Sequence, residues 1–283
     1  GLGVTTDSSG NIYVTGYTRG DLDGNTNSGR NDIFLVKFNS SGIKQWTKQL
    51  GTSSTEFGRD LTTDLLGNIY VPGFTRGGLD GNTNSGGKDI FLVKYNSSGT
   101  KIWTKQLGTS KDEDGYQVTT DSTGHIYMTG YTDGDLDGNT SSGGRDIFLI
   151  KFNSSGTKIW TKQLGTSKND EGYEVTIDSS GNIYVTGWTG GGLDGNTNMG
   201  GYDIFLIKFN SSGTKQWTKQ LGTSSSFEIG LGVTTDSSGN IYVTGYTKGG
   251  GLDGNTNFGG YDIFLVKFNS SGTKQWTKQL GTS

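Results

Sequence analysis

The sequence predicts an all-β fold, a five-bladed β-propeller with four antiparallel strands in each blade of about 57 residues. Three observations predict it. The 283 residues include 51 glycines but no alanine, the best helix former. Each of five copies contains four runs rich in β-branched and aromatic residues, which is the strand number of a propeller blade. A segment DIFLVK or DIFLIK recurs at spacings of 57 to 59 residues, beginning at Asp32, Asp89, Asp146, Asp203 and Asp262.

In the first copy, the expected strands cover Gly3 to Asp7, Asn11 to Thr18, Asp32 to Asn39 and Lys44 to Leu50. The first two are joined by DSSGN and the last two by NSSG. In these segments an Asp or Asn side chain can accept backbone hydrogen bonds, and the glycine can adopt a positive φ. We therefore expect two tight hairpins in each copy. A long Gly- and Asn-rich loop connects the second strand to the third.

The middle strands are apolar almost without interruption, which is expected when neighbouring blades cover both faces of a sheet. The fourth strand carries Lys44 and Lys48, which fit an exposed outer edge. A parallel β-helix is the main structural alternative, but its coils are usually much shorter and lack paired hairpins.

The five copies fill the chain, so we expect a single propeller domain over residues 1–283. Its blades would cover about 1–52, 53–109, 110–166, 167–223 and 224–283. Gly1 to Asp7 matches Gly230 to Asp236, so the chain begins at a first strand and ends after a fourth. Closure of a ring would then rest on side-chain packing between the first and last blades. An open array, or a larger ring made from several chains, are the alternatives.

Charge and composition exclude several classes of function. The net charge of −3 provides no basic surface for nucleic acid or anionic lipid. The longest apolar runs are far below the roughly 20 residues of a membrane span. The chain has no cysteine and a single histidine, His125, which excludes disulfides, thiolate sites and multi-histidine metal centres. We expect no nucleic-acid partner and no membrane insertion.

The combination of DSSGNIYVTGYT, DIFLVKFNSSG, a tryptophan and LG resembles the SBBP repeat, a β-propeller repeat common in exported and surface-attached bacterial proteins. The resemblance covers all five copies. It implies a propeller fold and an extracellular or cell-surface location, and it brings no established catalytic residues. The second copy departs from the pattern at Leu65, Leu66 and Pro72, and the third has His125 where the others have Asn.

The loop motif LDGNTN, followed by the Asp that opens the third strand, offers side-chain oxygens at alternating positions. Such oxygens could converge on a hard cation such as Ca²⁺, which takes six to eight oxygen ligands. The candidate calcium ligands, copy by copy, are Asp23, Asn25, Asn27 and Asp32; Asp80, Asn82, Asn84 and Asp89; Asp137, Asn139, Ser141 and Asp146; Asp194, Asn196, Asn198 and Asp203; and Asp253, Asn255, Asn257 and Asp262.

The same residues also suit an ordinary surface loop, through Asx turns and left-handed conformations. Compared with an EF-hand, the glycine is displaced and no bidentate Glu closes the loop. Each site would hold two carboxylates, so binding would be weak. Calcium is the one cofactor that the sequence suggests.

Repeated turn residues carry two further motifs with a structural explanation. Asp7, Asp64, Asp121, Asp178 and Asp236 resemble part of an Asp box but lack its tryptophan, and we interpret them as hairpin residues. The NSSG turns match a glycosylation acceptor, which matters only in a glycosylating host. Their asparagines are Asn39, Asn96, Asn153, Asn210 and Asn269.

Acidic residues gather where one copy passes into the next, and we expect them to make the loop face of a propeller acidic. They are Glu56, Glu113, Asp114, Asp170, Glu171 and Glu228. Carboxylates from different blades could serve a glycosidase. However, an acid and a base need different environments, and near-identical blades supply near-identical ones. The residues that break the repeat look scattered: Arg59, Asp60, Asp112, Asp133, Glu174, Trp188, Met199 and Phe258.

We therefore expect a non-enzymatic scaffold or binding module of an exported bacterial protein, stabilised by calcium if the loops bind it. A multivalent lectin is the first alternative, because repeated weak sites gain strength by avidity on a glycan or surface polymer. A glycoside-acting enzyme is the second, and a protein partner also stays open. Met199, Tyr202, Phe258 and Tyr261 are candidate ligand contacts, although variation on a tolerant loop would also explain them. Trp188 is interpreted as core packing.

Overall fold

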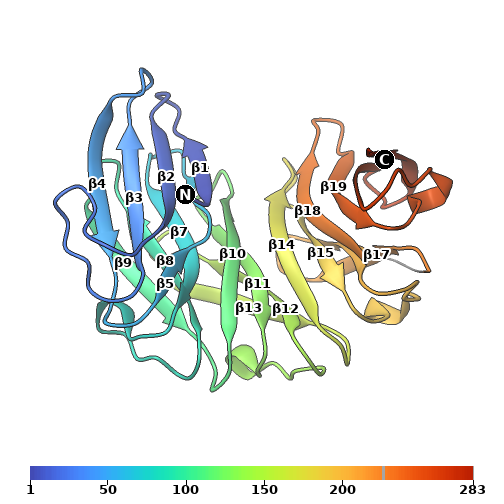
Figure 1. Ribbon diagram of the computed structural model, residues 1–283, viewed down its shortest axis with the longest axis horizontal. Helices are drawn as coiled ribbons and strands as arrows, with labels where there is room; N and C mark the ends of the chain where they lie inside the picture. Colours follow the sequence, from blue (N-terminus) through green and yellow to red (C-terminus); the bar gives the residue numbers. More distant parts are fainter. Residues whose placement is uncertain (225–226, 283) are drawn as a thin grey trace. The chain divides into compact units, whose positions relative to one another are not determined.

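The computed structural model describes residues 1–224 and 227–282, and it is all-β (Figure 1). Within these residues the strands form five antiparallel sheets, and each sheet follows the chain order of its strands. Each sheet is one blade of a five-bladed β-propeller. None of the helices in this part of the chain has the length and apolar character needed to cross a membrane.

The second, third and fourth strands of successive blades begin and end within one residue of equivalent positions of the repeat, whereas the first strands differ in length. Their bounds are β1 (Gly3–Thr6), β2 (Ile12–Thr18), β3 (Asp32–Phe38) and β4 (Lys44–Leu50); β5 (Glu56–Gly58), β6 (Thr62–Thr63), β7 (Ile69–Thr75), β8 (Asp89–Tyr95) and β9 (Lys101–Leu107); β10 (Glu113–Thr120), β11 (Ile126–Thr132), β12 (Asp146–Phe152) and β13 (Lys158–Leu164); β14 (Asp170–Ile177), β15 (Ile183–Thr189), β16 (Asp203–Phe209) and β17 (Lys215–Leu221); β18 (Phe227–Thr235), β19 (Ile241–Lys248), β20 (Tyr261–Phe268) and β21 (Lys274–Leu280).

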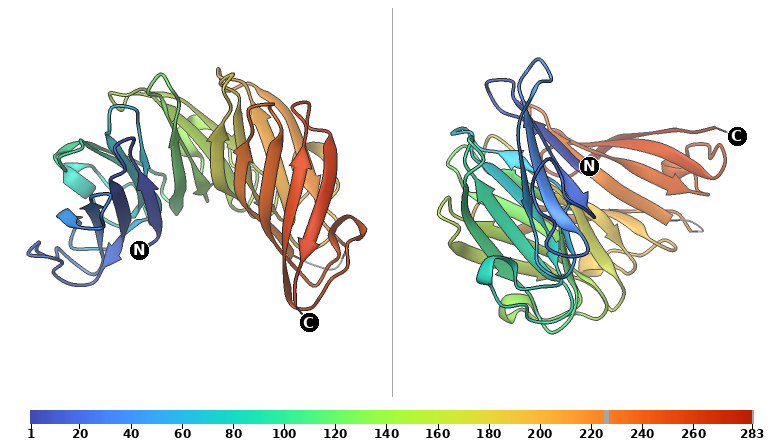
Figure 2. Two further views of the ribbon diagram at one scale, coloured as in Figure 1. Left: turned by 90° about the horizontal axis from the view of Figure 1, so that it is seen from above. Right: turned by 60° about the vertical axis from the view of Figure 1, so that its left-hand side comes forward.

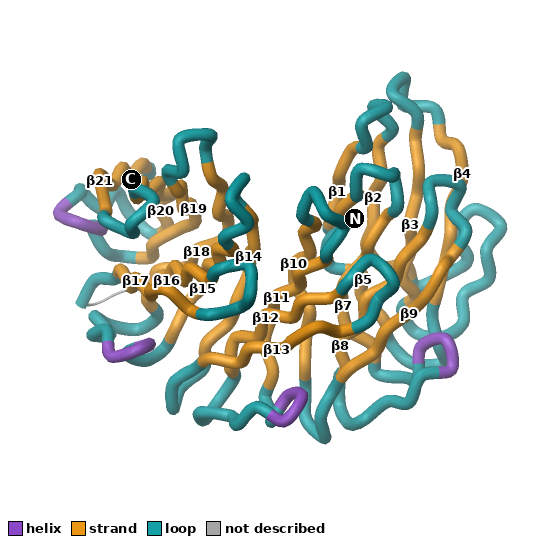
Figure 3. Tube along the Cα trace, turned by 180° about the vertical axis from the view of Figure 1, so that it is seen from behind, coloured by secondary structure: helices purple, strands orange, loops and turns teal. Residues whose placement is uncertain are grey.

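Four short 3-10 turns lie in the loops that connect the second and third strands of a blade (Figure 3). They are η1 (Leu79–Gly81), η2 (Leu136–Gly138), η3 (Leu193–Gly195) and η4 (Leu252–Gly254). Each is formed by the LDG of the LDGNTN motif, and its aspartate has a positive φ of 53 to 58°. In these four blades the LDG residues therefore give the long loop the same turn.

The chain forms two compact units, and the division passes through the third blade. The first unit comprises Gly1–Thr140 and Leu149–Thr161, and the second comprises Ser141–Phe148 and Lys162–Ser283. Within each unit neighbouring blades pack face to face, with the strands of each sheet in chain order (Figure 2). The single domain expected over residues 1–283 stays a prediction.

The hairpin turns have the chemistry that the sequence indicates. Asp7 Oδ1 accepts hydrogen bonds from the backbone N–H groups of Ser9 and Asn11, both at 2.9 Å, and its Oδ2 accepts one from the Tyr13 hydroxyl at 2.9 Å. Gly10 completes the turn with φ at 76°. The structural role inferred for the turn aspartates is confirmed. The asparagines of the NSSG turns accept backbone hydrogen bonds in the same way.

Packing between blades buries the middle strands on both faces. All seven residues of β8 are buried, as are all seven of β12. Ile204 and Leu206 of the fourth blade share a core cluster with Val243, Phe264 and Val266 of the fifth. The first and second blades form the same kind of cluster. Both of these interfaces join the Ile/Leu face of one blade to the Val/Phe face of the next.

The second blade has an interrupted first strand, and Pro72 explains the interruption. Its inner edge consists of the separate strands β5 and β6, both paired with β7. The corresponding strands β10 and β14 are continuous except for a bulge. Pro72 lies in β7 opposite the break and has no backbone N–H for the ladder. The departure noted in the sequence therefore has a local effect and leaves the blade intact.

Each third strand opens with a buried aspartate that fixes the end of the fourth strand. Asp89 is 0% exposed, and its Oδ2 accepts hydrogen bonds from Ser85 N and Gln106 Nε2, both at 2.9 Å. Its other carboxylate oxygen lies against Gly108, where a Cβ atom would overlap it. The glycine of the LG pair is therefore required by close approach.

We predict that Gly108→Ala lowers the free energy of unfolding by about 1–3 kcal/mol, because the added methyl group must displace the buried Asp89 carboxylate. Gly20→Ala is the matched control, since no heavy atom lies within 4 Å of a Cβ at Gly20. The control should change stability by less than about 0.5 kcal/mol. Denaturant unfolding measures both, and equal effects of the two substitutions would contradict the prediction.

Candidate functional site

The LDGNTN loops are held by hydrogen bonds to their own blade. Asp23 accepts from the Lys44 ammonium and from the Thr47 hydroxyl, the latter at 2.6 Å. These two donors hold the pKa of the Asp23 carboxyl below its usual range. Asn25 Nδ2 donates to Leu22 O at 2.9 Å. The loop residues expected to bind calcium therefore already stabilise the loop itself.

The two carboxylates proposed for one calcium site accept hydrogen bonds from different residues of the fourth strand. Asp23 binds Thr47, whereas Asp32 accepts from Gln49 Nε2 at 3.0 Å. Residues two apart on a strand are separated by about 7 Å, whereas oxygens around one Ca²⁺ lie within about 2.6 Å of it. The two carboxylates therefore have different hydrogen-bond partners on this strand. Over residues 1–224 and 227–282, no group of three or more His, Asp or Glu side chains could hold a metal ion. Calcium binding stays a prediction.

The acids at the passages between blades are buried, so the expectation that they make the loop face acidic is wrong. Glu56, Glu113, Asp170 and Glu228 are all 0% exposed. Glu113 Oε1 accepts hydrogen bonds from the hydroxyls of Thr109 at 2.6 Å and Thr132 at 2.9 Å. Burial raises the pKa of Glu113, although these hydrogen bonds oppose the rise. Through such hydrogen bonds the acids hold the segment that connects two blades, and this structural role accounts for their burial.

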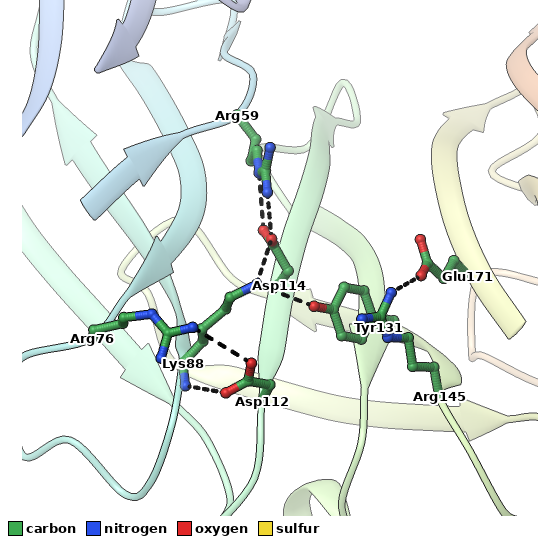
Figure 4. Close-up of polar contacts among 8 residues, drawn as sticks. All are labelled: Arg59, Arg76, Lys88, Asp112, Asp114, Tyr131, Arg145 and Glu171. Atoms are coloured by element: carbon green, nitrogen blue, oxygen red, sulfur yellow. Dashed lines mark hydrogen bonds and ion pairs between the residues drawn. The ribbon is translucent and has the colours of Figure 1, made fainter. Parts of the chain in front are cut away.

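A second set of acids is paired with basic side chains from the neighbouring blade (Figure 4). Asp114 is 1% exposed and faces the Arg59 guanidinium, whose Nε lies 3.1 Å from Asp114 Oδ1. The pair has two parallel hydrogen bonds, which is the strongest geometry for these groups. Lys88 Nζ lies 3.8 Å from the same carboxylate and 3.4 Å from the Tyr131 hydroxyl.

Aromatic rings surround these cations. The Arg59 guanidinium carbon lies 5.3 to 5.6 Å from the ring centroids of Phe57, Phe74 and Tyr116. Lys88 Nζ lies 4.6 Å from the Phe74 centroid. Contacts of this geometry are attractive, because a ring face carries negative charge density. The rings therefore hold both basic groups in place.

The outer part of this group is accessible to solvent. Arg76 lies 3.7 Å from Asp112, and their side chains are 48% and 34% exposed. Asp112 also accepts from the backbone N–H of Lys88 at 2.9 Å. We call Arg59, Arg76, Lys88, Asp112 and Asp114 the polar cluster. It lies between the second and third blades, within the first unit.

The polar cluster brings together two of the eight residues that break the repeat, and the other six are not part of it. Arg59 and Asp112 both belong to it, and the backbone N–H of Asp133 donates to Asp112 O at 2.9 Å. Arg145 and Glu171 form a similar ion pair at the next passage. Sequence reasoning missed the grouping because Arg59 and Asp114 are 55 residues apart and occupy different positions of the repeat.

The candidate ligand contacts have different environments. Met199, Phe258 and Tyr261 are 48%, 44% and 62% exposed. Tyr202 packs against Trp188, with ring centroids 4.0 Å apart. Trp188 is 6% exposed, in agreement with a packing role. A role of the three exposed side chains in binding stays a prediction.

Comparison with known proteins agrees with the repeat and the fold. The SBBP family, described as a β-propeller repeat, matches residues 1–23, 45–80, 102–137, 159–194 and 216–253. An uncharacterised WD repeat-containing protein of Acanthamoeba polyphaga mimivirus is 27% identical over 88% of the chain, which covers 25% of that protein. The regulatory protein FlaEY of Caulobacter vibrioides is 25% identical over 86% of the chain, which covers 29% of it. The chain thus spans about a quarter of these relatives.

Two solved structures share the fold at low sequence identity. A protein of unknown function from Bacteroides caccae aligns with a TM-score of 0.53 at 11% identity, over 98% of this chain and 81% of that one. A polysaccharide lyase, the PL25 ulvan lyase bound to GlcA(1-4)Rha3S, aligns with a TM-score of 0.54 at 13% identity, over 98% and 69%. At these identities the likeness concerns the fold alone.

The pH dependence of stability tests the role of Asp60, which lies at the interface between the second and third blades. Burial raises the pKa of its carboxyl from 3.8 to about 6, against hydrogen bonds from Leu61, Val118 and Gln117. An acid with a raised pKa in the folded state costs stability that grows as the pH rises from the unfolded pKa of 3.8 and reaches its full size above the folded pKa of about 6. We predict that Asp60→Asn stabilises the protein at pH 7.5 by on the order of 3 kcal/mol and has little effect below pH of about 4. Denaturant unfolding across this range measures it, and a benefit that does not grow with pH would contradict it.

The calcium prediction is tested by thermal unfolding with EDTA and with millimolar CaCl₂. A cation that binds only the folded loops raises Tm by linkage. Calcium would compete with the Lys44 ammonium for Asp23, so Lys44→Met should enlarge the calcium-dependent rise. An unchanged Tm in both proteins would remove the prediction.

Proposed function

The chain belongs to the SBBP β-propeller repeat family, and we propose that it is a non-catalytic binding module of an exported or cell-surface protein, with the polar cluster as its contact site. The observation that carries the proposal is the partly exposed group of charged side chains and aromatic rings that the second and third blades form together. Arg59 and Asp112 differ from their counterparts in the other blades, although Arg76 matches Arg19 of the first blade. The second and third blades therefore combine residues that the repeat does not reproduce together elsewhere in the sequence.

The environment of the acids supports binding over catalysis. Hydrolysis of a glycoside uses two carboxyl groups that flank the substrate and differ in protonation. The acids at the blade passages are 0 to 2% exposed. Glu113 is engaged by threonine hydroxyls, and Asp114 by a guanidinium. Their charges already serve contacts within the protein, and reaching a substrate would break those contacts.

A glycan with acidic groups is the ligand class that the polar cluster favours. Arg59, Arg76 and Lys88 exceed Asp112 and Asp114 by one positive charge, and guanidinium groups recognise carboxylate and sulfate groups through paired hydrogen bonds. The partly exposed rings of Phe57 and Tyr116 beside Arg59 add apolar surface. The ulvan lyase with the same fold holds a glycan of this kind. This lectin function is the second candidate, and it rests on the chemistry of the cluster.

The stoichiometry of binding separates the polar cluster from the repeated loops. A site built from residues that break the repeat occurs once in the chain, whereas sites on the LDGNTN loops would occur up to five times. Isothermal titration with a short acidic oligosaccharide should therefore give one ligand per chain. About five ligands would favour the loops and multivalent binding.

We predict that Arg76→Gln weakens binding of uronate- or sulfate-bearing glycans about tenfold or more, because it removes an accessible charged donor. Arg19→Gln is the matched control. Arg19 occupies the same position of the repeat in the first blade, is exposed and lies outside the polar cluster. A glycan array identifies the ligand, and titration of each variant measures its affinity.

Two outcomes would contradict the proposal. If Arg76→Gln and Arg19→Gln bind the ligand equally well, the polar cluster is not the contact site. If the protein cleaves a glycoside and Glu113→Gln abolishes the cleavage in a protein that stays folded, the chain is an enzyme.

A further inference from the structure

A cavity of about 360 Å³ lies between the hairpin turns of the second and third blades, and we call it the hairpin cavity. All of its lining residues belong to the first unit. The second blade contributes Leu65 and Leu66 of the turn between β6 and β7, together with Lys94 of β8. The third blade contributes Ser154 and residues 121–124, which form the turn between β10 and β11. Hairpin turns and LDGNTN loops lie at opposite ends of the strands, so this cavity is at the other end of the blades from the polar cluster.

Leu65 and Leu66 distinguish this turn from the equivalent turns of the other blades. Their side chains are 77% and 84% exposed. Every other blade has two hydroxyl-bearing residues at these positions: Ser8 and Ser9, Ser122 and Thr123, Ser179 and Ser180, and Ser237 and Ser238. The turn does not need the leucines, because the backbone N–H of Leu66 binds the turn aspartate just as its serine counterpart in the first blade does. The leucines therefore add an aliphatic wall to the cavity without serving the fold.

The two carboxylates that line the hairpin cavity already have their hydrogen-bond partners. Asp64 Oδ1 accepts from the backbone N–H groups of Leu66 at 3.0 Å and Asn68 at 2.9 Å. Its Oδ2 accepts from Asn68 Nδ2 at 2.8 Å and from the Tyr70 hydroxyl at 2.9 Å. These four bonds fill the lone-pair positions of a carboxylate. Asp121 is bound by its own turn and strand in the same way. Neither carboxylate therefore has an oxygen left to pair with a cationic ligand.

Lys94 supplies a hydrogen-bond donor to the cavity. Its Nζ donates to Ser154 O at 3.0 Å and lies 5.2 Å from the ring centroid of Tyr70. An ammonium group has three N–H donors, so these two contacts leave one N–H for a ligand. The charge of Asp64 opposes the lowering of the Lys94 pKa by burial, so the ammonium already has an anion nearby. An uncharged acceptor such as a carbonyl oxygen suits this donor, as the contact with Ser154 O shows.

We propose that the hairpin cavity binds a medium-length acyl chain whose head is an uncharged carbonyl group, such as an amide or an ester. Leu65 and Leu66 pack against the chain, and Lys94 donates to the carbonyl oxygen. Among the described residues no aromatic side chain lines the cavity, so a sugar or a nucleobase would find no ring to stack on. The volume of about 360 Å³ lies within the range of small-molecule sites. This site is separate from the polar cluster and does not rest on the function proposed for it.

Isothermal titration with the N-methyl amides of butanoic, hexanoic and octanoic acid tests the proposal. Affinity should rise about fivefold for each step of two carbons, because each added methylene buries apolar surface against the leucines. Octanoate and octylammonium, which have charged heads, should bind more weakly than the octanoic amide. Equal affinities of the three amides would overturn the proposal, as would tighter binding of either charged compound.

The double variant Leu65→Ser/Leu66→Ser gives the second blade the turn of the first blade, so it should fold. It should bind the octanoic amide about tenfold more weakly or worse and lose the dependence on chain length, because the aliphatic wall is gone. Ile102→Gln is the matched control. Ile102 is 51% exposed on β9, does not line the cavity, and has the counterparts Gln45 and Gln216. Equal losses in the two variants would reveal unspecific adsorption to exposed apolar side chains and would overturn the proposal.

Lys94→Met separates the head of the ligand from its chain. This variant should weaken binding of all three amides by the same factor and keep the dependence on chain length, because it removes only the donor to the carbonyl oxygen. Unchanged affinities would show that the carbonyl group does not bind Lys94 and would overturn that assignment.

Sedimentation with phosphatidylcholine vesicles distinguishes a free acyl ligand from a membrane. The proposal predicts that the wild type and the double variant Leu65→Ser/Leu66→Ser sediment equally little with vesicles. Vesicle binding that the double variant loses, in a protein that binds none of the amides, would mean that the leucines contact a lipid surface and would overturn the proposal.

Discussion

The packing of one blade against the next is the constraint on which the structure depends. A single four-stranded blade would expose an apolar face to water on each side, because every copy of the repeat has apolar residues on both faces of its sheet. A blade is therefore stable only when other blades cover these faces. Full burial of one Leu or Ile side chain contributes about 1.5–3 kcal/mol, whereas a typical hydrogen bond contributes about 1 kcal/mol. The Ile and Leu of each blade therefore outweigh any single polar contact at the seam, and stability grows with the number of covered faces.

The polar groups at the seams act differently from the apolar ones. A buried carboxylate such as Glu113 adds little net stability, because its hydrogen bonds mainly repay the loss of hydration. Its main effect is to hold the chain in position, because it links Thr109 in the passage between blades to Thr132 at the end of β11. Asp89 similarly holds Gln106 at the end of β9. These groups set the direction in which the chain enters the next blade, and thereby the position of the polar cluster.

Most of the fold could be predicted from the sequence because its signals are local. The strands of the first blade end within one residue of the predicted bounds, since DSSGN and NSSG fix the hairpins on either side. The polar cluster could not be predicted in this way. Comparison of equivalent positions shows that Arg59 is unusual, but it does not show that Arg59 lies beside Asp114, which occupies another position of the next copy. To predict contacts between neighbouring repeats, one must know which positions of one blade lie opposite which positions of the next, and this information comes only from the structure.

Differences between the repeats match across the seams. Where the residue before the third strand is basic, as in Lys88 and Arg145, an acid of the following blade faces it. Where it is Tyr202, the facing side chain is Phe227, with ring centroids 5.0 Å apart. Near-identical apolar faces alone would let any blade pack on any other. These matched pairs make the correct neighbour more favourable, because a misplaced blade would leave an acid buried without a cation. The residues that break the repeat therefore have two effects: they favour the correct order of the blades, and they contribute Arg59 and Asp112 to the polar cluster of the second and third blades.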